Sequence, residues 1–77
     1  MDENYKYFDT QRILRYLQQH KEGATVDAII QYSGADKLRV YPALFELEQE
    51  SRLEVLEREE LGAPTKVRLR KLRIENR

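Results

Sequence analysis

The spacing of the apolar residues changes once along this chain, near Ser51, and no other feature restricts its fold as much. Before that point, apolar residues recur every three or four positions, which is typical of helices that bury one face. After it, residues 65–70 alternate, with Val67 and Leu69 on one side and basic residues on the other. Such alternation indicates a half-buried strand. The sequence therefore predicts helices first and a β-hairpin after them.

The first helix is expected to begin at Asp9, whose carboxylate suits a helix N-cap, and to run to about residue 21. Phe8 and Ile13 occupy the positions of a hydrophobic staple at such a start. Gly23 is expected to end this helix, as C-terminal glycines do. Residues 1–8 would then form a polar and aromatic arm that precedes the folded part.

Two further helices are expected before the hairpin. Thr25 is the candidate N-cap of a short second helix, and Gly34 would stop it. Residues 33–36 have turn chemistry and lead into a third helix that runs to about residue 50. This third helix has the clearest apolar stripe, formed by Val40, Leu44 and Leu47.

The hairpin is expected to contain strands over residues 53–57 and 65–70, with a loop that contains glycine and proline over residues 59–64. The resulting order predicts a mostly helical α+β fold, the winged helix-turn-helix, with three helices followed by a two-stranded β-hairpin wing. We expect one domain over residues 9–72, followed by a basic tail over residues 73–77.

Three short motifs narrow this expectation. They are Val40-Tyr41-Pro42-Ala43-Leu44, Leu44-x-x-Leu47-Glu48-x-x-Ser51-Arg52-Leu53 and Gly62-Ala63-Pro64-Thr65-Lys66. The first resembles the Y-P-A-L-x-x-L-E signature of PadR-like transcriptional regulators, and the third resembles the wing of that family. The second is similar to the passage by which winged helices leave their third helix. The resemblance covers roughly residues 25–70 and implies DNA binding and transcriptional control.

The chain departs from the PadR-like pattern in two places. Ser51 stands where such proteins usually have a glycine in the left-handed conformation, which serine adopts at some cost. Members of the family continue into a helical segment that builds a dimer, whereas this chain ends soon after the second strand. We therefore expect either a monomer or a homodimer through the arm and the first helix. Pro42 predicts that the third helix starts near Leu38 or Arg39, or is kinked.

Candidate DNA contacts follow from the place of the third helix, whose N-terminal part enters the major groove in helix-turn-helix proteins. Arg39 has the side chain to read guanine, and Lys37 suits a phosphate. The alternative is that both are ordinary solvated residues. Tyr41 lies beside them and pairs with Phe45 at helical spacing, for which packing on the first helix is the alternative. Thr25 either donates to a phosphate or only caps the second helix.

The wing supplies a second group of candidates. Lys66 and Arg68 are expected on one face of the second strand, together with Arg70, where they would follow the phosphates. The alternative is that these cations pair across the hairpin with Glu54, Glu57 or Glu59.

The charge balance does not favour a nucleic-acid ligand, because 14 basic and 14 acidic residues give a net charge of zero. The charges are unevenly distributed: residues 44–60 contain seven glutamates and two arginines, and residues 61–77 contain six basic residues and one glutamate. Either these segments pair with each other or they form a partner surface. A winged-helix module that binds a protein and no DNA is therefore the alternative function.

Other classes of function have little support in the sequence. The chain has no cysteine, and His20 is its one histidine, so we expect neither a zinc site nor any cofactor. It has no nucleophile arrangement and no glycine-rich phosphate loop, so we do not expect an enzyme. An acidic N-terminus and short apolar runs predict a cytoplasmic protein that does not cross a membrane.

Overall fold

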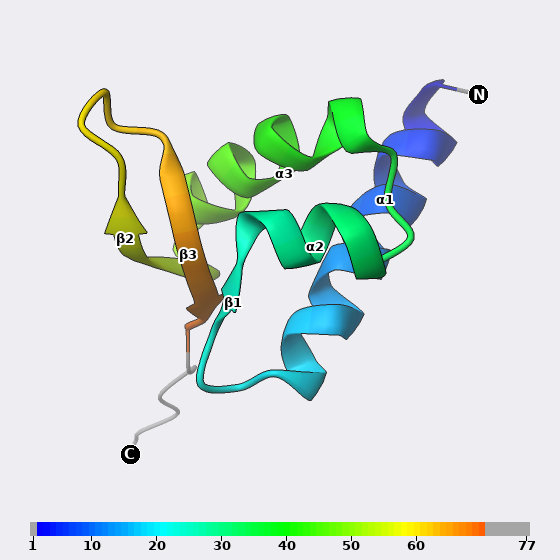
Figure 1. Ribbon diagram of the computed structural model, residues 1–77. Helices are drawn as coiled ribbons and strands as arrows, with labels where there is room; N and C mark the ends of the chain where they lie inside the picture. The colour runs from blue at the N-terminus through cyan, green and yellow to red at the C-terminus, as the bar shows by residue number, and fades with distance from the viewer. Residues whose placement is uncertain (1, 71–77) are drawn as a thin grey trace, which may run out of the picture.

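The computed structural model describes residues 2–70 of the chain. Over this range it is an α+β fold with three helices and a three-stranded antiparallel sheet. The helices pack together, and the hairpin of the second and third strands stands beside them (Figure 1). The elements are α1 (Asp2–Gln19), β1 (Ala24–Thr25), α2 (Val26–Tyr32), α3 (Lys37–Gln49), β2 (Leu53–Arg58) and β3 (Pro64–Leu69). The expected basic tail over residues 73–77 lies outside the described residues.

The strands are ordered β1-β3-β2, so β3 is central. Ala24 of β1 lies opposite Val67 of β3, and Leu53 of β2 lies opposite Leu69. The sequence predicts the hairpin strands but not β1, which makes the prediction of a two-stranded sheet incomplete. A strand of two residues is too short to alternate, and its pairing with β3 is what defines it.

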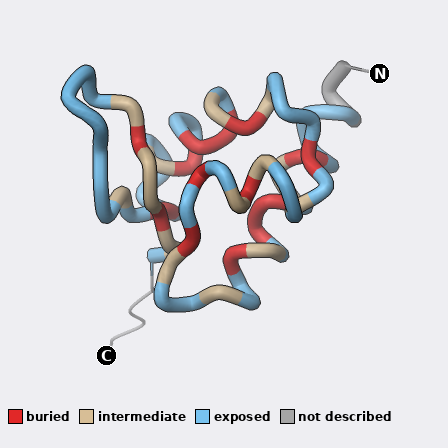
Figure 2. The backbone as a smooth tube through the Cα atoms, in the orientation of Figure 1, coloured by how far each residue is buried: buried red, intermediate tan, exposed pale blue. Residues whose placement is uncertain are grey.

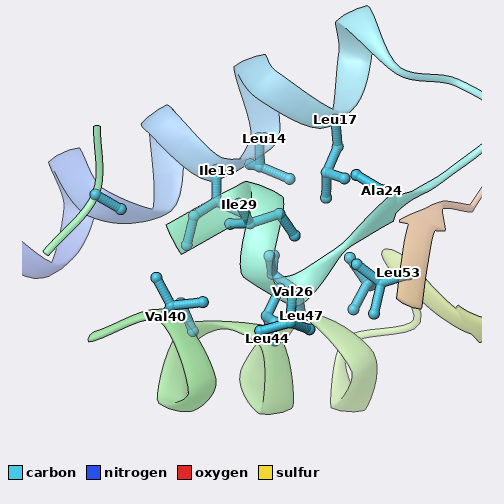
Figure 3. Packing of buried hydrophobic residues seen from close by; sticks show 13 residues of the cluster. Ile13, Leu14, Leu17, Ala24, Val26, Ile29, Val40, Leu44, Leu47 and Leu53 are labelled. Carbon is cyan, nitrogen blue, oxygen red and sulfur yellow. The ribbon is translucent and has the colours of Figure 1, made fainter. Parts of the chain in front are cut away.

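The hydrophobic core lies between the helices and the sheet (Figure 2). Ile13 and Leu17 of α1 point toward Val40 and Leu44 of α3, and Ile29 of α2 lies between the two helices (Figure 3). All five side chains are buried, each contributing about 1.5–3 kcal/mol through removal from water. The helical stripes expected from the sequence are therefore confirmed as core.

α1 begins at Asp2 and not at Asp9, so residues 2–8, expected as an arm, form its first turns. Asp9 lies inside the helix and is only 6% exposed. Its carboxylate accepts hydrogen bonds from the backbone N–H of Asp36 at 3.2 Å and from the Arg12 guanidinium at 3.3 Å. The predicted N-cap is therefore wrong, and so is the staple at Phe8, which is exposed. Asp9 instead fixes α1 to the turn before α3.

The short helix α2 and the start of α3 have side-chain caps. The Thr25 hydroxyl accepts from the backbone N–H of Ala28 at 3.1 Å, which confirms its capping role. The Asp36 carboxylate accepts from the backbone N–H of Leu38 at 2.9 Å and starts α3 at Lys37, earlier than the sequence predicts. Pro42 lies inside α3, where it lacks the N–H that would bond to the Leu38 carbonyl.

The exit from α3 has the left-handed geometry that the sequence predicts. Ser51 has a φ of +62°. Its N–H donates to the Glu48 carbonyl at 3.0 Å, and the N–H of Arg52 donates to the Leu47 carbonyl at 2.9 Å. These two bonds form a Schellman motif, which satisfies carbonyls that the helix leaves without partners.

Gly23 follows α1 but does not end it, because the helix stops at Gln19. The register of β2 against β3 shifts between Val55 and Glu57, which makes Leu56 an extra residue in the strand. A Cβ atom on Gly23 would lie 2.8 Å from Leu56 Cδ1, and Gly23 has a φ of +121°. A glycine is therefore required here for the close approach between this loop and the bulged hairpin.

Candidate nucleic-acid interface

The outward face of α3 is apolar from Leu38 to Phe45. The core side of this helix is formed by Val40, Ala43, Leu44 and Leu47. At about 100° per residue, the side opposite the core consists of Leu38, Pro42 and Phe45, followed by the exposed Gln49 at the last residue of the helix. Leu38 is 81% exposed and Phe45 is 45% exposed. A surface helix normally has polar residues on this side. We refer to Leu38, Pro42 and Phe45 as the α3 stripe.

Two cations flank the start of the α3 stripe. Lys37 and Arg39 are displaced from its centre by about 100° in opposite directions around the helix. Lys37 is exposed and Arg39 is half-buried. Neither forms an ion pair with another residue in the range 5–70, over which side chains are described. One basic side chain therefore stands on each side of the apolar face.

The three glutamates of α3 and its C-cap are all ion-paired. Lys6 of α1 lies 2.7 Å from Glu46, and Arg58 of β2 forms an ion pair with Glu48. Glu50 has the loosest pair, at 3.6 Å from Arg52. Such exposed pairs contribute little to stability, but they offset the negative charge beside α3. The remaining carboxylate, that of Asp36, accepts the backbone hydrogen bond that caps the helix.

The tip of the β2–β3 hairpin is acidic. Arg58 is held by Glu48 and donates to the Gly62 carbonyl at 3.0 Å, so it does not extend freely into solvent. Leu61 at the tip is 93% exposed. Three carboxylates near the tip form no ion pair within the described part of the chain, namely those of Glu57, Glu59 and Glu60.

Of the two cations of β3, one forms an ion pair with a carboxylate of the described residues and the other does not. Arg68 lies opposite Glu54 in the sheet, and its Nε is 2.8 Å from the Glu54 carboxylate. The expected alternative of cross-strand pairing is therefore correct for Arg68. Lys66 lies opposite Glu57 in register, but no ion pair joins them. Lys66 also neighbours Thr25 of β1 across the sheet.

The residues expected at the site therefore fall into two groups. Lys37, Arg39 and Tyr41 lie together on α3. Thr25, Lys66 and Arg68 lie on the adjacent strands β1 and β3. In Figure 1, α3 starts beside α1 and ends near β2, so the first turn of α3 is the end farther from the hairpin.

Tyr41 is half-buried and packs against the core, with its ring centroid 6.4 Å from that of Phe45. The expected aromatic pair is present, but Phe45 extends outward into the α3 stripe. The sequence interpretation missed Leu38 and Pro42 as members of an exposed face. Their spacing at i, i+4 and i+7 with Phe45 was the available signal, since it is offset from the core stripe of the same helix.

A second exposed apolar region lies on the first turns of α1, where Tyr5, Tyr7 and Phe8 are all exposed. The rings of Tyr7 and Phe8 pack edge to face, with centroids 5.5 Å apart. An open depression of about 290 Å³ lies between α1 and the C-terminal half of α3. Most of the residues that line it are polar types, and they include the ion pair of Lys6 with Glu46.

Other signs of function are few in the described range. No group of three or more histidine, cysteine or acidic side chains within residues 5–70 is arranged to hold a metal ion. None of the described helices has both the length and the apolar character needed to cross a membrane. No family model, curated protein or solved structure matches this chain.

Proposed function

We propose that this chain is a winged helix-turn-helix domain that binds duplex DNA, with α3 in the major groove. The order of elements supports this proposal, because α2 and α3 are joined by the short turn of residues 33–36 and are followed by a hairpin. In helix-turn-helix proteins the second of two such helices is the one that reads the groove. The position of β1 beside β3 is compatible with this arrangement.

The observation that carries the proposal is the distribution of charge around α3. Once Glu46, Glu48 and Glu50 are offset by their partners, Lys37 and Arg39 are the charges of the helix that form no ion pair with a carboxylate of residues 5–70. DNA affinity comes mainly from neutralising phosphates with such side chains. A net charge of zero is therefore compatible with DNA binding, because three of the four carboxylates of α3 and its caps are ion-paired. The fourth, that of Asp36, accepts the hydrogen bond that caps the helix.

The positions of these two cations favour contacts to phosphates. Because Lys37 and Arg39 lie on the two flanks of α3, they face the walls of a groove that the helix occupies, and the walls are the phosphate backbones. The guanine contact expected for Arg39 would need its side chain to turn toward the groove floor. In this proposal, Tyr41 packs beneath the contact surface and positions Phe45.

The wing makes a smaller contribution in this proposal. Lys66 is its candidate phosphate contact, since Arg68 is paired with Glu54. The Thr25 hydroxyl accepts from the Ala28 N–H and keeps its own O–H to donate to a phosphate. The carboxylates of Glu59 and Glu60 would repel phosphates, which places the hairpin tip away from the DNA backbone.

The test is a titration of labelled random-sequence duplex DNA with the protein, followed by fluorescence anisotropy at about 50 mM and about 200 mM salt. We expect weak binding at low salt that falls steeply at the higher salt concentration, because bound cations release counterions. Absence of binding at low salt would contradict the proposal.

A second candidate function is protein binding, and the observation that favours it is the hairpin tip. Leu61 is almost fully exposed and directly follows Glu59 and Glu60, a combination that suits a basic partner with an apolar contact point. The comparison is between wild-type protein and a Leu61→Ser, Glu60→Gln variant in cross-linking from a nuclease-treated lysate. A partner recovered equally by both would exclude the tip as its binding site.

A further inference from the structure

The α3 stripe has no side-chain hydrogen-bonding group, because Leu38, Pro42 and Phe45 contain only carbon and hydrogen beyond the backbone. Direct reading of bases usually relies on hydrogen bonds from arginine, lysine, asparagine or glutamine to base edges. On this face such a side chain follows only at Gln49, one turn beyond the α3 stripe. The exception to reading by hydrogen bonds is thymine, whose 5-methyl group protrudes into the major groove and is recognised by apolar contact. We infer that α3 reads thymine through its 5-methyl group. This inference rests on the proposed DNA binding.

The length of the stripe suits a short run of neighbouring bases. Leu38, Pro42 and Phe45 are spaced at i, i+4 and i+7, so at a rise of about 1.5 Å per residue they extend over about 10 Å. The bases of one strand are separated by about 3.4 Å along the axis. The stripe therefore covers about three base-pair steps, which is enough for two or three adjacent methyl groups.

The charges that border the stripe complement a groove. Lys37 and Arg39 stand on its two sides, where the phosphate backbones on either side of a groove would lie. Farther along the helix, the two sides are occupied by Glu46 and Glu48, and both are ion-paired. The apolar face is thus bordered by cations at its start and by ion-paired carboxylates farther along the helix.

The expected selectivity follows from the apolar area that contact removes from water. Burial of one methyl group corresponds to about a fourfold gain in affinity. A duplex that offers two thymine methyl groups to the stripe would therefore bind about tenfold or more tightly than its uracil counterpart. The salt dependence of binding would be the same for both duplexes, because their phosphates are identical.

The experiment compares four duplexes by anisotropy at low salt: a thymine-rich duplex, the same sequence with uracil in place of thymine, a cytosine-rich duplex, and the same sequence with 5-methylcytosine. We expect uracil to weaken binding at least about fourfold. We also expect 5-methylcytosine to strengthen it, since it carries the same methyl group. A gain from 5-methylcytosine without a loss from uracil would overturn the assignment to thymine.

Two variants separate the stripe from the rest of the surface. Leu38→Ser removes the most exposed residue of the stripe, and because Leu38 is 81% exposed we expect the fold to be unaffected, as circular dichroism would verify. This variant should keep salt-dependent binding but lose most of the difference between thymine and uracil. Leu61→Ser is the matched control, since it removes an exposed leucine at the hairpin tip, and it should retain the full difference.

The inference and the proposed function fail in different ways. Equal binding of the thymine and uracil duplexes by the wild-type protein would overturn the reading of methyl groups while leaving DNA binding in place. If the Leu38→Ser variant kept the full difference in affinity between the thymine and uracil duplexes, α3 would not be the element that reads thymine. Absence of binding to all four duplexes would overturn both proposals.

Discussion

Ser51 holds a backbone conformation that glycine adopts at lower free energy. Its φ of +62° is required by the two hydrogen bonds that close the end of α3. A side chain at such a position costs about 1–2 kcal/mol. A glycine at this position would avoid that cost, but it would also lose more conformational entropy on folding than a serine does. The two effects partly cancel.

We therefore expect Ser51→Gly to raise the free energy of unfolding by about 0.5–1 kcal/mol, which corresponds to a few degrees in Tm. Thermal unfolding followed by circular dichroism measures this change. Ser33→Gly is the control, because Ser33 has a φ of −76° and its hydroxyl accepts from the Ala35 N–H. That substitution should lower stability. A decrease in stability for Ser51→Gly would contradict the account of the α3 exit.

Asp9 illustrates what a single sequence allows one to predict about a residue. Its chemistry is as expected, since the carboxylate accepts a backbone hydrogen bond near a helix start. The helix in question is α3 and not α1, because the donor is the N–H of Asp36. The identity of a partner 27 positions away depends on how the two helices pack, which local spacing does not encode.

At the scale of elements, prediction succeeded where the apolar period is long. The core face of α3 and the strands of the hairpin follow from repeated spacing, and the structure confirms both. It failed for β1 and for the first turns of α1. The two residues of β1 carry no period, and the polar and aromatic residues 2–8 lack the apolar stripe that marks a helix packed on a core.

The ion pairs around α3 belong to this scale, since they join it to α1 and β2. If they offset charge next to bound DNA, Lys6→Ala should weaken DNA binding about threefold at low salt by leaving Glu46 unpaired, and the effect should shrink at higher salt. The double variant Lys6→Ala, Glu46→Gln should restore wild-type affinity. Anisotropy titrations of these proteins form the test, and a double variant as weak as Lys6→Ala would show that Glu46 does not act on the DNA.

At the scale of the whole molecule, the exposed rings of α1 lie away from the hydrophobic core. Tyr5, Tyr7 and Phe8 lie on its first turns, and large rings left in water favour association. A homodimer through α1, one of the two states expected from the sequence, would cover them. It would also present two copies of α3 to a DNA site with two-fold symmetry.

Sedimentation equilibrium tests this arrangement. We expect the wild-type protein to self-associate as its concentration rises, and Phe8→Ser to weaken this association because Phe8 is 52% exposed and makes no core contact that the change would remove. Leu61→Ser serves as the control for loss of an exposed apolar side chain elsewhere. A wild-type protein that remains monomeric at high concentration would exclude the dimer.

The central claim is that α3 contacts DNA through its two flanking cations. The most direct measurement is the salt dependence of duplex binding for three proteins: the wild type, an α3 variant and a control variant. The α3 variant combines Lys37→Ala with Arg39→Ala. The control variant combines Arg15→Ala with Lys21→Ala, and so removes two cations of the α1 region that form no described ion pair. We predict that the α3 variant loses most of its affinity and that its salt slope falls by about two, while the control variant changes little. Equal losses in the two variants, or an unchanged salt slope for the α3 variant, would contradict the claim.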